Sequence, residues 1–450
     1  MNKFICTFIT FFTSIILFAN SGKIMVSGQV KNHSATTISI SHLNNQELIS
    51  AKLEADGKFN MSVKTEAGYY FLKYGRNTAY IYLYPKDELS IVFDAKHFQS
   101  TLVFEGHGSI RNNYLAKKSE MDSELTKDLE AFYKVDEGTY LRNIEKVKST
   151  HLSELSKHDI EKFFVNEEKK SLEYERLLSI QNYESNYKFY LGEEVSPSEE
   201  FYKPIENLKL DNNEDYKKQP YFRYLVNSVW SKRIEAANDV DGMLKVLRKV
   251  SSQDLAISLV NGFYSKISSN NERSKDYLDL IKRVTKHKPF IDAAEKRYQE
   301  VMSSKSLKEG DFSPEFSYEA VDGSIVNLSE FKGKYVYIDV WATWCAPCIK
   351  QSPYLKELEE RYHSKNIVFV SISVDKEKFK DTWKQMIVDK ELGGIQLFSD
   401  KSFDSEFMNA YAVNSIPRFI LIDPEGKIVK TEAPRPSFDK TRKLLDELLN

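Results

Sequence analysis

The sequence has no excess of charge of either sign. Its 64 Lys and Arg residues are balanced by 66 Asp and Glu residues, so the formal net charge is -2. Proteins that bind nucleic acids need a basic patch or stripe, and this composition excludes that class of partner. Hydrophobic residues make up 41% and charged residues 29% of the 450, which argues against wholesale disorder and is enough for two or three domains.

Long apolar runs are also missing, apart from one at the start of the chain. There, Lys3 precedes an uncharged apolar run over residues 4–19, and small residues follow it. The run is shorter than the roughly 20 residues of a membrane-spanning helix. We therefore expect residues 1–21 to be a secretory signal peptide cleaved before Gly22. An uncleaved membrane anchor is the alternative.

Cysteine is scarce, with three residues in the whole chain. Cys6 lies inside the apolar run and lacks the small-residue context of a lipid acceptor, which leaves Cys345 and Cys348 in the mature protein. Exported proteins usually use cysteines as staples between distant segments, but a bridge this short stabilises a fold very little. Two cysteines alone also cannot form a four-ligand zinc site. The pair is better explained by redox chemistry, with no metal and no cofactor.

Residues 22–107 have the period-two alternation of β-strands. Asp56-Gly57 lies between two alternating segments, 49–53 and 59–63, and predicts a hairpin there. Short strands at this spacing predict an antiparallel β-sandwich. An aromatic stripe could bind a ligand, although packing on the sheet is the better interpretation. The stripe consists of Tyr80, Tyr82 and Tyr84.

Residues 108–306 contain little glycine or proline, and their apolar residues recur with the helical period. One expected helix face is formed by Leu125, Leu129, Phe132 and Tyr133. No fixed-period repeat indicates a solenoid. The segment is predicted to be a helical bundle or spacer, and its function is not readable from its sequence.

Residues 307–450 alternate between strands and helices, which predicts an α/β domain. A buried strand over 335–341 runs directly into the cysteine motif, and Pro347 suits the first turn of the helix that follows. Turns at Asp322-Gly323 and at 423–426 predict two hairpins.

The position of the cysteines at a strand-to-helix junction gives them unequal roles. Free N–H groups and the helix dipole at the N-terminus lower a thiol pKa, which makes Cys345 the expected nucleophile. Cys348 is one turn further into the helix, and we expect it to be shielded and to resolve the mixed disulfide.

The segment from Trp341 to Cys348, which reads Trp-Ala-Thr-Trp-Cys-Ala-Pro-Cys, resembles the TlpA/ResA-like thiol–disulfide oxidoreductases of the thioredoxin superfamily. The resemblance covers about the last 140 residues and includes Phe-Lys-Gly-Lys at 331–334 and Asp-Pro-Glu-Gly at 423–426. Residues 24–107 are similar to the β-rich domain that precedes such modules in exported Bacteroidota proteins. The family implies a thioredoxin fold and reduction of protein disulfides in the periplasm, as part of cell redox homeostasis and sometimes of cytochrome c maturation. It also implies a membrane thiol–disulfide electron donor.

The resemblance implies further site residues. Ile416 and Pro417 match the cis-proline loop that faces the cysteines, and Asp339 matches the buried acid beneath them. Burial would raise the pKa of Asp339 and suit it to accept the proton of Cys348; a carboxylate in solvent is the alternative. Many ResA-like proteins carry Glu where this chain has Gln351, which cannot take a proton. The expected substrate-binding residues are Trp344, Ala346, Pro347, Ile416 and Pro417.

Other classes of function fit less well. The peroxide-reducing motif of peroxiredoxins does not precede Cys345, and the eight histidines are scattered without the spacing of a metal site or hydrolase triad. Two alternatives stay open. One is a disulfide oxidase or isomerase, since the same motif runs in either direction according to its potential. The other is a surface protein in which residues 24–305 bind a glycan or partner and the redox domain is accessory. Neither the substrate nor the oligomeric state follows from the sequence.

Overall fold

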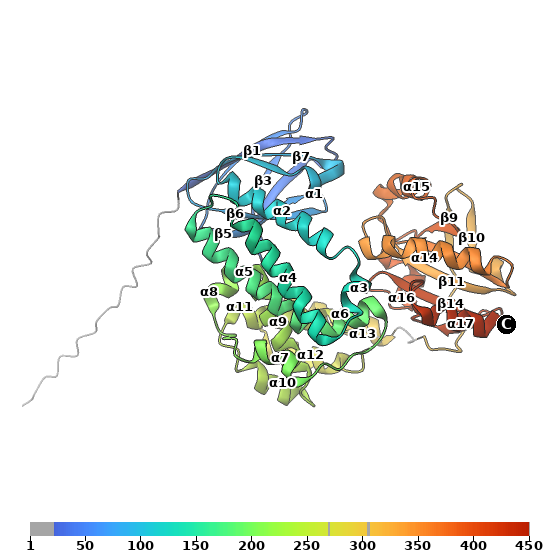
Figure 1. Ribbon diagram of the computed structural model, residues 1–450. Helices are drawn as coiled ribbons and strands as arrows, with labels where there is room; N and C mark the ends of the chain where they lie inside the picture. Colours follow the sequence, from blue (N-terminus) through green and yellow to red (C-terminus); the bar gives the residue numbers. More distant parts are fainter. Residues whose placement is uncertain (1–21, 269–270, 304–306, 450) are drawn as a thin grey trace, which may run out of the picture. The chain divides into compact units, whose positions relative to one another are not determined.

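The computed structural model describes residues 22–268, 271–303 and 307–449 (Figure 1). The predicted signal peptide therefore lies outside the described residues. In the part of the chain that the structure describes, no helix has both the length and the apolar composition needed to cross a membrane.

The chain divides into two compact units. The first contains the residues up to 183 together with 197–228, and the second contains 184–196 together with the residues from 229 on. The predicted domain ranges follow changes of secondary structure instead, and as domain borders they stay a prediction.

The N-terminal strands form two four-stranded sheets around one core. The sheet orders are β4-β1-β7-β8 and β3-β2-β5-β6. Val26 of the first sheet and Ile81 of the second are both fully buried in the same hydrophobic cluster, which confirms a β-sandwich. A short helix, α1, precedes the last strand. These elements are β1 (Lys23–Lys31), β2 (Thr37–Ser41), β3 (Glu47–Lys52), β4 (Lys58–Lys64), β5 (Gly68–Tyr74), β6 (Asn77–Leu83), β7 (Glu88–Asp94), α1 (Phe98–Thr101) and β8 (Val103–His107).

Two details of the predicted sandwich are wrong. β1 pairs in parallel with β7, so the sandwich is not wholly antiparallel. The Asp56-Gly57 turn is present, with Gly57 at φ +80°, but β3 pairs with β2 and β4 pairs with β1. The turn therefore connects β3 of one sheet to β4 of the other, and the two strands do not form the predicted hairpin. Turn chemistry sets the local backbone, whereas the choice of strand partners depends on how both sheets bury their inner faces.

Helices occupy most of the chain from residue 109 to residue 303, as predicted. They are α2 (Ser109–Leu125), α3 (Leu129–Tyr133), α4 (Glu137–Leu155), α5 (Lys162–Gln181), α6 (Tyr183–Leu191), α7 (Glu199–Glu206), α8 (Asn213–Lys218), α9 (Pro220–Glu235), α10 (Val240–Leu247), α11 (Gln253–Ser265), α12 (Ser274–Val284) and α13 (Lys288–Ser303). The predicted helix face with Leu125, Leu129, Phe132 and Tyr133 is wrong, because the helix is interrupted. α2 ends at Leu125, and a separate helix, α3, begins at Leu129. The carboxylate of Asp128 accepts a hydrogen bond from the Ala131 N–H at 2.9 Å and starts α3 as its N-cap.

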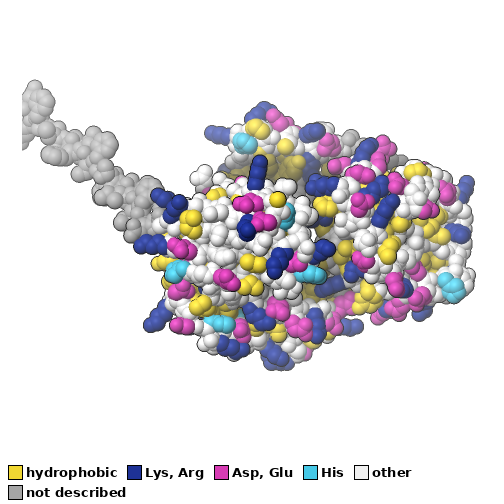
Figure 2. Space-filling model, turned by 90° about the horizontal axis from the view of Figure 1, so that it is seen from above, with side chains coloured by type: hydrophobic (Ala, Val, Ile, Leu, Met, Phe, Trp, Pro, Cys, Tyr) yellow, Lys and Arg dark blue, Asp and Glu magenta, His cyan; other side chains and the backbone are white. Residues whose placement is uncertain are grey.

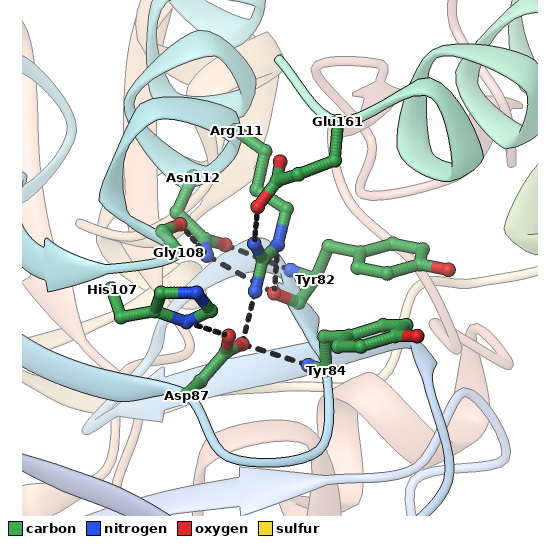
Figure 3. A network of polar contacts seen from close by, with 8 residues as sticks. All are labelled: Tyr82, Tyr84, Asp87, His107, Gly108, Arg111, Asn112 and Glu161. Atoms are coloured by element: carbon green, nitrogen blue, oxygen red, sulfur yellow. Dashed lines mark hydrogen bonds and ion pairs between the residues drawn. The ribbon is translucent and has the colours of Figure 1, made fainter.

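A buried ion pair joins α2 to the β-sandwich (Figure 3). The side chains of Arg111 on α2 and Asp87 before β7 are both fully buried and form a close ion pair. Arg111 also contacts Glu161 at 2.7 Å, and Asp87 accepts a hydrogen bond from the Tyr84 N–H at 2.7 Å. Buried charges are tolerated when they are paired and hydrogen-bonded in this way. The network is one of the contacts that join the sandwich to the first helices.

The aromatic stripe packs against α5. The ring of Tyr82 meets Phe164 edge-on at a centroid distance of 5.0 Å, and Tyr84 stacks on Phe163 at 4.2 Å. Aromatic pairs at these distances are stabilising. The interpretation of the stripe as packing is therefore confirmed for these two residues.

The C-terminal part of the second unit is built on a seven-stranded mixed sheet in the order β10-β9-β13-β12-β11-β14-β15. β11, β12 and β13 are parallel, and β9 with β10 and β14 with β15 form the two predicted hairpins. The elements are β9 (Ser317–Ala320), β10 (Ile325–Asn327), β11 (Tyr335–Trp341), α14 (Ala346–Tyr362), β12 (Ile367–Ser373), α15 (Lys380–Asp389), β13 (Ile395–Phe398), α16 (Glu406–Ala410), β14 (Arg418–Ile422), β15 (Ile428–Lys430) and α17 (Asp439–Leu449). The predicted α/β domain is confirmed.

Two hydrophobic clusters cover the two faces of this sheet. Tyr337 of β11 packs with Leu358 of α14 and Leu445 of α17, and its neighbour Ile338 packs on the other face with Trp383 of α15. The alternation along β11 thus fixes which side chains lie beneath α14. On the face of the molecule seen in Figure 2, Lys and Arg side chains are interspersed with Asp and Glu, in keeping with the nearly neutral net charge.

Candidate active site

The two cysteines lie at the N-terminus of α14, directly after β11. They form a disulfide, with their Cα atoms 5.2 Å apart. Cys345 is the N-cap of α14, and its Sγ accepts a hydrogen bond from the Cys348 N–H at 3.2 Å. A thiolate at this position would receive the same N–H and the positive end of the helix dipole. The local structure therefore provides the physical means to lower the pKa of Cys345 in the reduced protein.

Burial does not separate the roles of the two cysteines. Cys345 is 4% exposed and Cys348 is 3% exposed, so both sulfurs are covered in the disulfide form. The expected shielding of Cys348 is present, but Cys345 is shielded as well. The difference lies in position, since Cys345 caps the helix and Cys348 is within its first turn. The assignment of Cys345 as nucleophile stays a prediction that rests on this difference.

The expected substrate-binding residues next to the cysteines differ in solvent exposure. Trp344 is 45% exposed and lies 6.4 Å from Phe403 between ring centroids. Ala346 is exposed and Pro347 is half-buried in the first turn of α14. Trp344 and Ala346 are thus accessible to a partner protein, and their role in substrate binding stays a prediction.

The peptide bond between Ile416 and Pro417 is cis, as predicted. Pro417 directly precedes β14, in which Arg418 is the register partner of Val340 near the end of β11. Ile416 packs against the hydrophobic cluster that contains both cysteines. The loop therefore lies at the same edge of the sheet as the redox pair.

Asp339 lies on β11, on the face of the sheet that α14 covers. It is 8% exposed, and its Oδ1 has no hydrogen-bond partner. Burial, with a smaller contribution from the charge of Glu359, raises the pKa of Asp339 to about 8. The burial expected for Asp339 is confirmed, which excludes the alternative of a carboxylate in solvent, and its role as a proton acceptor stays a prediction.

Gln351 has a structural contact. It is buried on α14, and its Oε1 accepts a hydrogen bond from the Ser437 N–H at 3.1 Å. This bond ties α14 to the segment before α17. Because an amide cannot accept a proton at neutral pH, Asp339 and not Gln351 stays the expected proton acceptor.

The sequence analysis missed Asp375, which holds the segment before the cysteines. This fully buried carboxylate accepts hydrogen bonds from the Thr343 N–H at 2.7 Å and from the Thr343 hydroxyl at 2.9 Å. The Ser373 hydroxyl donates a third at 3.0 Å. The sequence position of Asp375 could have predicted this contact. Asp375 follows the end of β12 by two residues, and the carboxyl ends of the parallel strands β11 and β12 meet at one edge of the sheet.

Glu359 was also missed. It lies on α14 and is partly exposed. Burial, followed by the charge of Glu360, raises the pKa of Glu359 to about 7, against an opposing effect of Lys356. In the sequence it is one of several charged residues on a helix, and no local pattern distinguishes it.

No group of three or more His, Cys, Asp or Glu side chains is arranged to hold a metal ion within residues 22–268, 271–303 and 307–449.

Comparison with known proteins gives one family. Residues 308–448 match the Redoxin family model. The chain is 32% identical over 136 residues to the thiol-disulfide oxidoreductase ResA of Bacillus subtilis, covering 30% of this chain and 72% of the relative. ResA of Bacillus cereus is 29% identical over 153 residues, and this match covers 34% of this chain and 83% of the relative. The crystal structure of the thioredoxin domain of a thiol-disulfide oxidoreductase from Bacteroides vulgatus is 30% identical, with 32% of this chain and all of that chain covered and a TM-score of 0.30. The chain therefore belongs to the ResA-like thiol–disulfide oxidoreductases of the thioredoxin superfamily, and its thioredoxin-like domain is C-terminal.

Proposed function

We propose that the protein reduces disulfide bonds in exported substrate proteins through Cys345 and Cys348. The observation that carries this proposal is the placement of the pair at the N-terminus of α14, next to the cis-Pro417 loop, with the buried acid Asp339 on the adjoining strand. Each of these features serves dithiol–disulfide exchange.

The first step is attack by the Cys345 thiolate on one sulfur of the substrate disulfide. The substrate S–S bond breaks, a bond forms between Cys345 Sγ and that sulfur, and the other substrate sulfur leaves as a thiolate. Exposed Trp344 and the backbone at cis-Pro417 offer the substrate an apolar contact and a partner for main-chain pairing.

The second step releases the substrate. Cys348 gives its proton to ionised Asp339, and its thiolate attacks Cys345 Sγ. The mixed disulfide breaks, the second substrate sulfur leaves as a thiolate, and the Cys345–Cys348 disulfide forms. Two electrons have passed from the protein to the substrate. A second thiol–disulfide exchange, with a dithiol donor held in the membrane, restores the reduced pair.

Kinetics of the full mature chain test the reaction. Cys348→Ser is expected to accumulate a mixed disulfide through Cys345, whereas Cys345→Ser is expected to form none and to lose insulin reduction. Reductase activity that survives Cys345→Ser would overturn the mechanism. A reduction potential near the oxidising end of the thioredoxin-fold range, about −120 mV, would favour a disulfide oxidase instead.

Export is tested separately from catalysis. Mass spectrometry of the protein purified from its native cells is expected to give a mature N-terminus at Gly22, and fractionation is expected to place it outside the cytoplasm. An N-terminus that retains residues 1–21 together with a membrane-bound chain would support the anchor alternative.

A further inference from the structure

A cavity of about 250 Å³ lies among helices α2, α3, α4 and α5, inside the first compact unit. Its lining combines apolar and polar side chains. The apolar ones include Leu129, Phe132, Tyr133, Tyr140, Ile144 and Leu172. The polar ones include Asp122, His151 and Glu175. A few polar groups set among apolar and aromatic side chains are typical of a site for a small molecule.

His151 in this lining is fully buried, and one of its ring nitrogens has no hydrogen-bond partner. Its Nε2 lies 2.6 Å from Oδ1 of Asp122. A carboxylate can only accept, so Nε2 carries the hydrogen of this bond and Nδ1 is an acceptor in the neutral ring. Nδ1 is the nitrogen without a partner. A buried acceptor without a donor costs stability, and a donor on a bound molecule would remove that cost.

Two cationic side chains in the lining are already neutralised by carboxylates. The Lys148 ammonium lies 2.7 Å from Glu173 and 3.4 Å from Glu145. The Arg176 guanidinium lies 2.6 Å from Glu173 and 3.4 Å from Glu145. Two positive and two negative charges therefore form a closed group, which adds no net charge to the cavity.

The other charges around the cavity are not balanced. The ammonium of buried Lys118 contacts both Glu168, at 3.1 Å, and Glu175, at 2.9 Å. Asp122 adds a third carboxylate, so three carboxylates share one ammonium among these described side chains. Burial raises the pKa of Glu175, against the charge of Lys118 and with a contribution from Asp122. Excess negative charge in a poorly solvated place favours a cation there.

A primary ammonium group meets both requirements. Its N–H groups can donate to the carboxylates and to the unpartnered imidazole nitrogen, and its charge offsets the excess of carboxylates. The rings of Phe132, Tyr133 and Tyr140 lie 5.4–5.7 Å apart between centroids, so an aromatic ring on the ligand would extend this cluster. An apolar cavity of about 150 Å³ accepts benzene, so about 250 Å³ leaves room for a ring with a short amine chain.

We propose that this cavity binds a small primary amine with an aromatic body. The ammonium meets Asp122, Glu175 and Nδ1 of His151, and the ring packs against Phe132 and Tyr140. Binding is non-covalent, so no bond is made or broken and no electron is transferred. The site lies outside the redox domain and gives the helices after the β-sandwich a role that goes beyond dithiol–disulfide exchange.

Isothermal titration calorimetry of the full mature chain with 2-phenylethylammonium tests the site. A dissociation constant below about 1 mM is expected for a ligand of this size. The neutral isostere 2-phenylethanol and the ringless methylammonium are each expected to bind at least about tenfold more weakly. Equal affinity for the amine and the alcohol would overturn the ammonium site, and equal affinity for methylammonium would overturn the aromatic body. No binding of 2-phenylethylammonium at about 10 mM would overturn the proposal as a whole.

Two variants place the binding in this cavity. Glu175→Gln is expected to weaken binding of 2-phenylethylammonium about tenfold or more, because a charge-assisted hydrogen bond is lost. Val147→Phe is expected to abolish binding without changing a charge, because Val147 lines the cavity and a larger side chain fills it. Glu120→Gln on the same helix as Asp122 is the matched control, since Glu120 is exposed, and is expected to bind as wild type.

Circular dichroism before each titration establishes that the variants are folded. Either variant carries the test alone if the other does not fold, since one removes a charge and the other fills space. Wild-type affinity in a folded Glu175→Gln or a folded Val147→Phe would overturn the site. Cys345→Ser is expected to bind the amine as wild type, so failure of the redox mechanism and failure of this site are distinguishable.

Discussion

Replacing Asp339 by Asn is expected to remove a pH-dependent loss of stability. In the folded protein the pKa of Asp339 is raised from its ordinary 3.8 to about 8. Between these values the folded state keeps the proton and the unfolded state releases it, so the unfolded state binds fewer protons. The free energy of unfolding then falls as the pH rises, by about 1.4 kcal/mol for each pH unit.

The size of the effect follows from the two pKa values. The pKa of Asp339 in the unfolded chain, 3.8, lies roughly 3 pH units below pH 7. Ionisation of Asp339 in the unfolded chain therefore lowers the free energy of unfolding by about 4 kcal/mol at pH 7. Nearly 3 kcal/mol of this arises between about pH 5 and pH 7. Asp339→Asn cannot ionise, so its stability relative to wild type is expected to increase by this amount over the same interval. The cost of burying the amide does not vary with pH and cancels from the comparison.

Urea denaturation of the oxidised full chain at pH 5, 6 and 7 measures this difference. Tryptophan fluorescence reports on the relevant domain, because Trp341, Trp344 and Trp383 lie there. Asp381→Asn is the control, since Asp381 is exposed on α15, and it is expected to follow the wild-type pH dependence. Parallel curves for wild type and Asp339→Asn would refute the reasoning, because they would mean that Asp339 does not hold its proton in the folded state.

Two further predictions concern residues that the sequence did not single out. Asp375→Ala leaves the part-buried Thr343 N–H without its acceptor, so we expect a loss of about 1–3 kcal/mol in the free energy of unfolding and a lower rate of insulin reduction. An unchanged rate would mean that Thr343 keeps its position without this bond. Arg111→Met leaves Asp87 buried without its cation, so we expect a loss of about 3–5 kcal/mol, measured by urea denaturation followed by circular dichroism. The double variant with Asp87→Leu is expected to lose less than Arg111→Met alone, and an equal or larger loss would contradict the ion-pair argument.

Much of the candidate site was predictable because its features are local. The junction of β11 and α14 places Cys345 at a helix N-terminus through sequence-adjacent residues, and Pro347 fits the first turn for the same reason. The burial of Asp339 was expected from the family resemblance, and strand alternation places it beneath α14. The cis bond before Pro417 came from family resemblance and not from local chemistry.

The sequence by itself determined the elements, the turns and the redox pair, because hydrophobic period, turn residues and helix capping act between neighbours in the chain. Only the tertiary structure decided the strand partners within the β-sandwich. The Asp56-Gly57 turn connects two sheets, and β1 pairs in parallel with β7, because each strand must bury its inner face against the whole sandwich. Tertiary structure likewise brought Asp375 to Thr343 across 32 positions, and brought Glu359 near enough for its charge to act on Asp339. These contacts depend on the register of parallel strands joined by long crossovers, which no local pattern encodes.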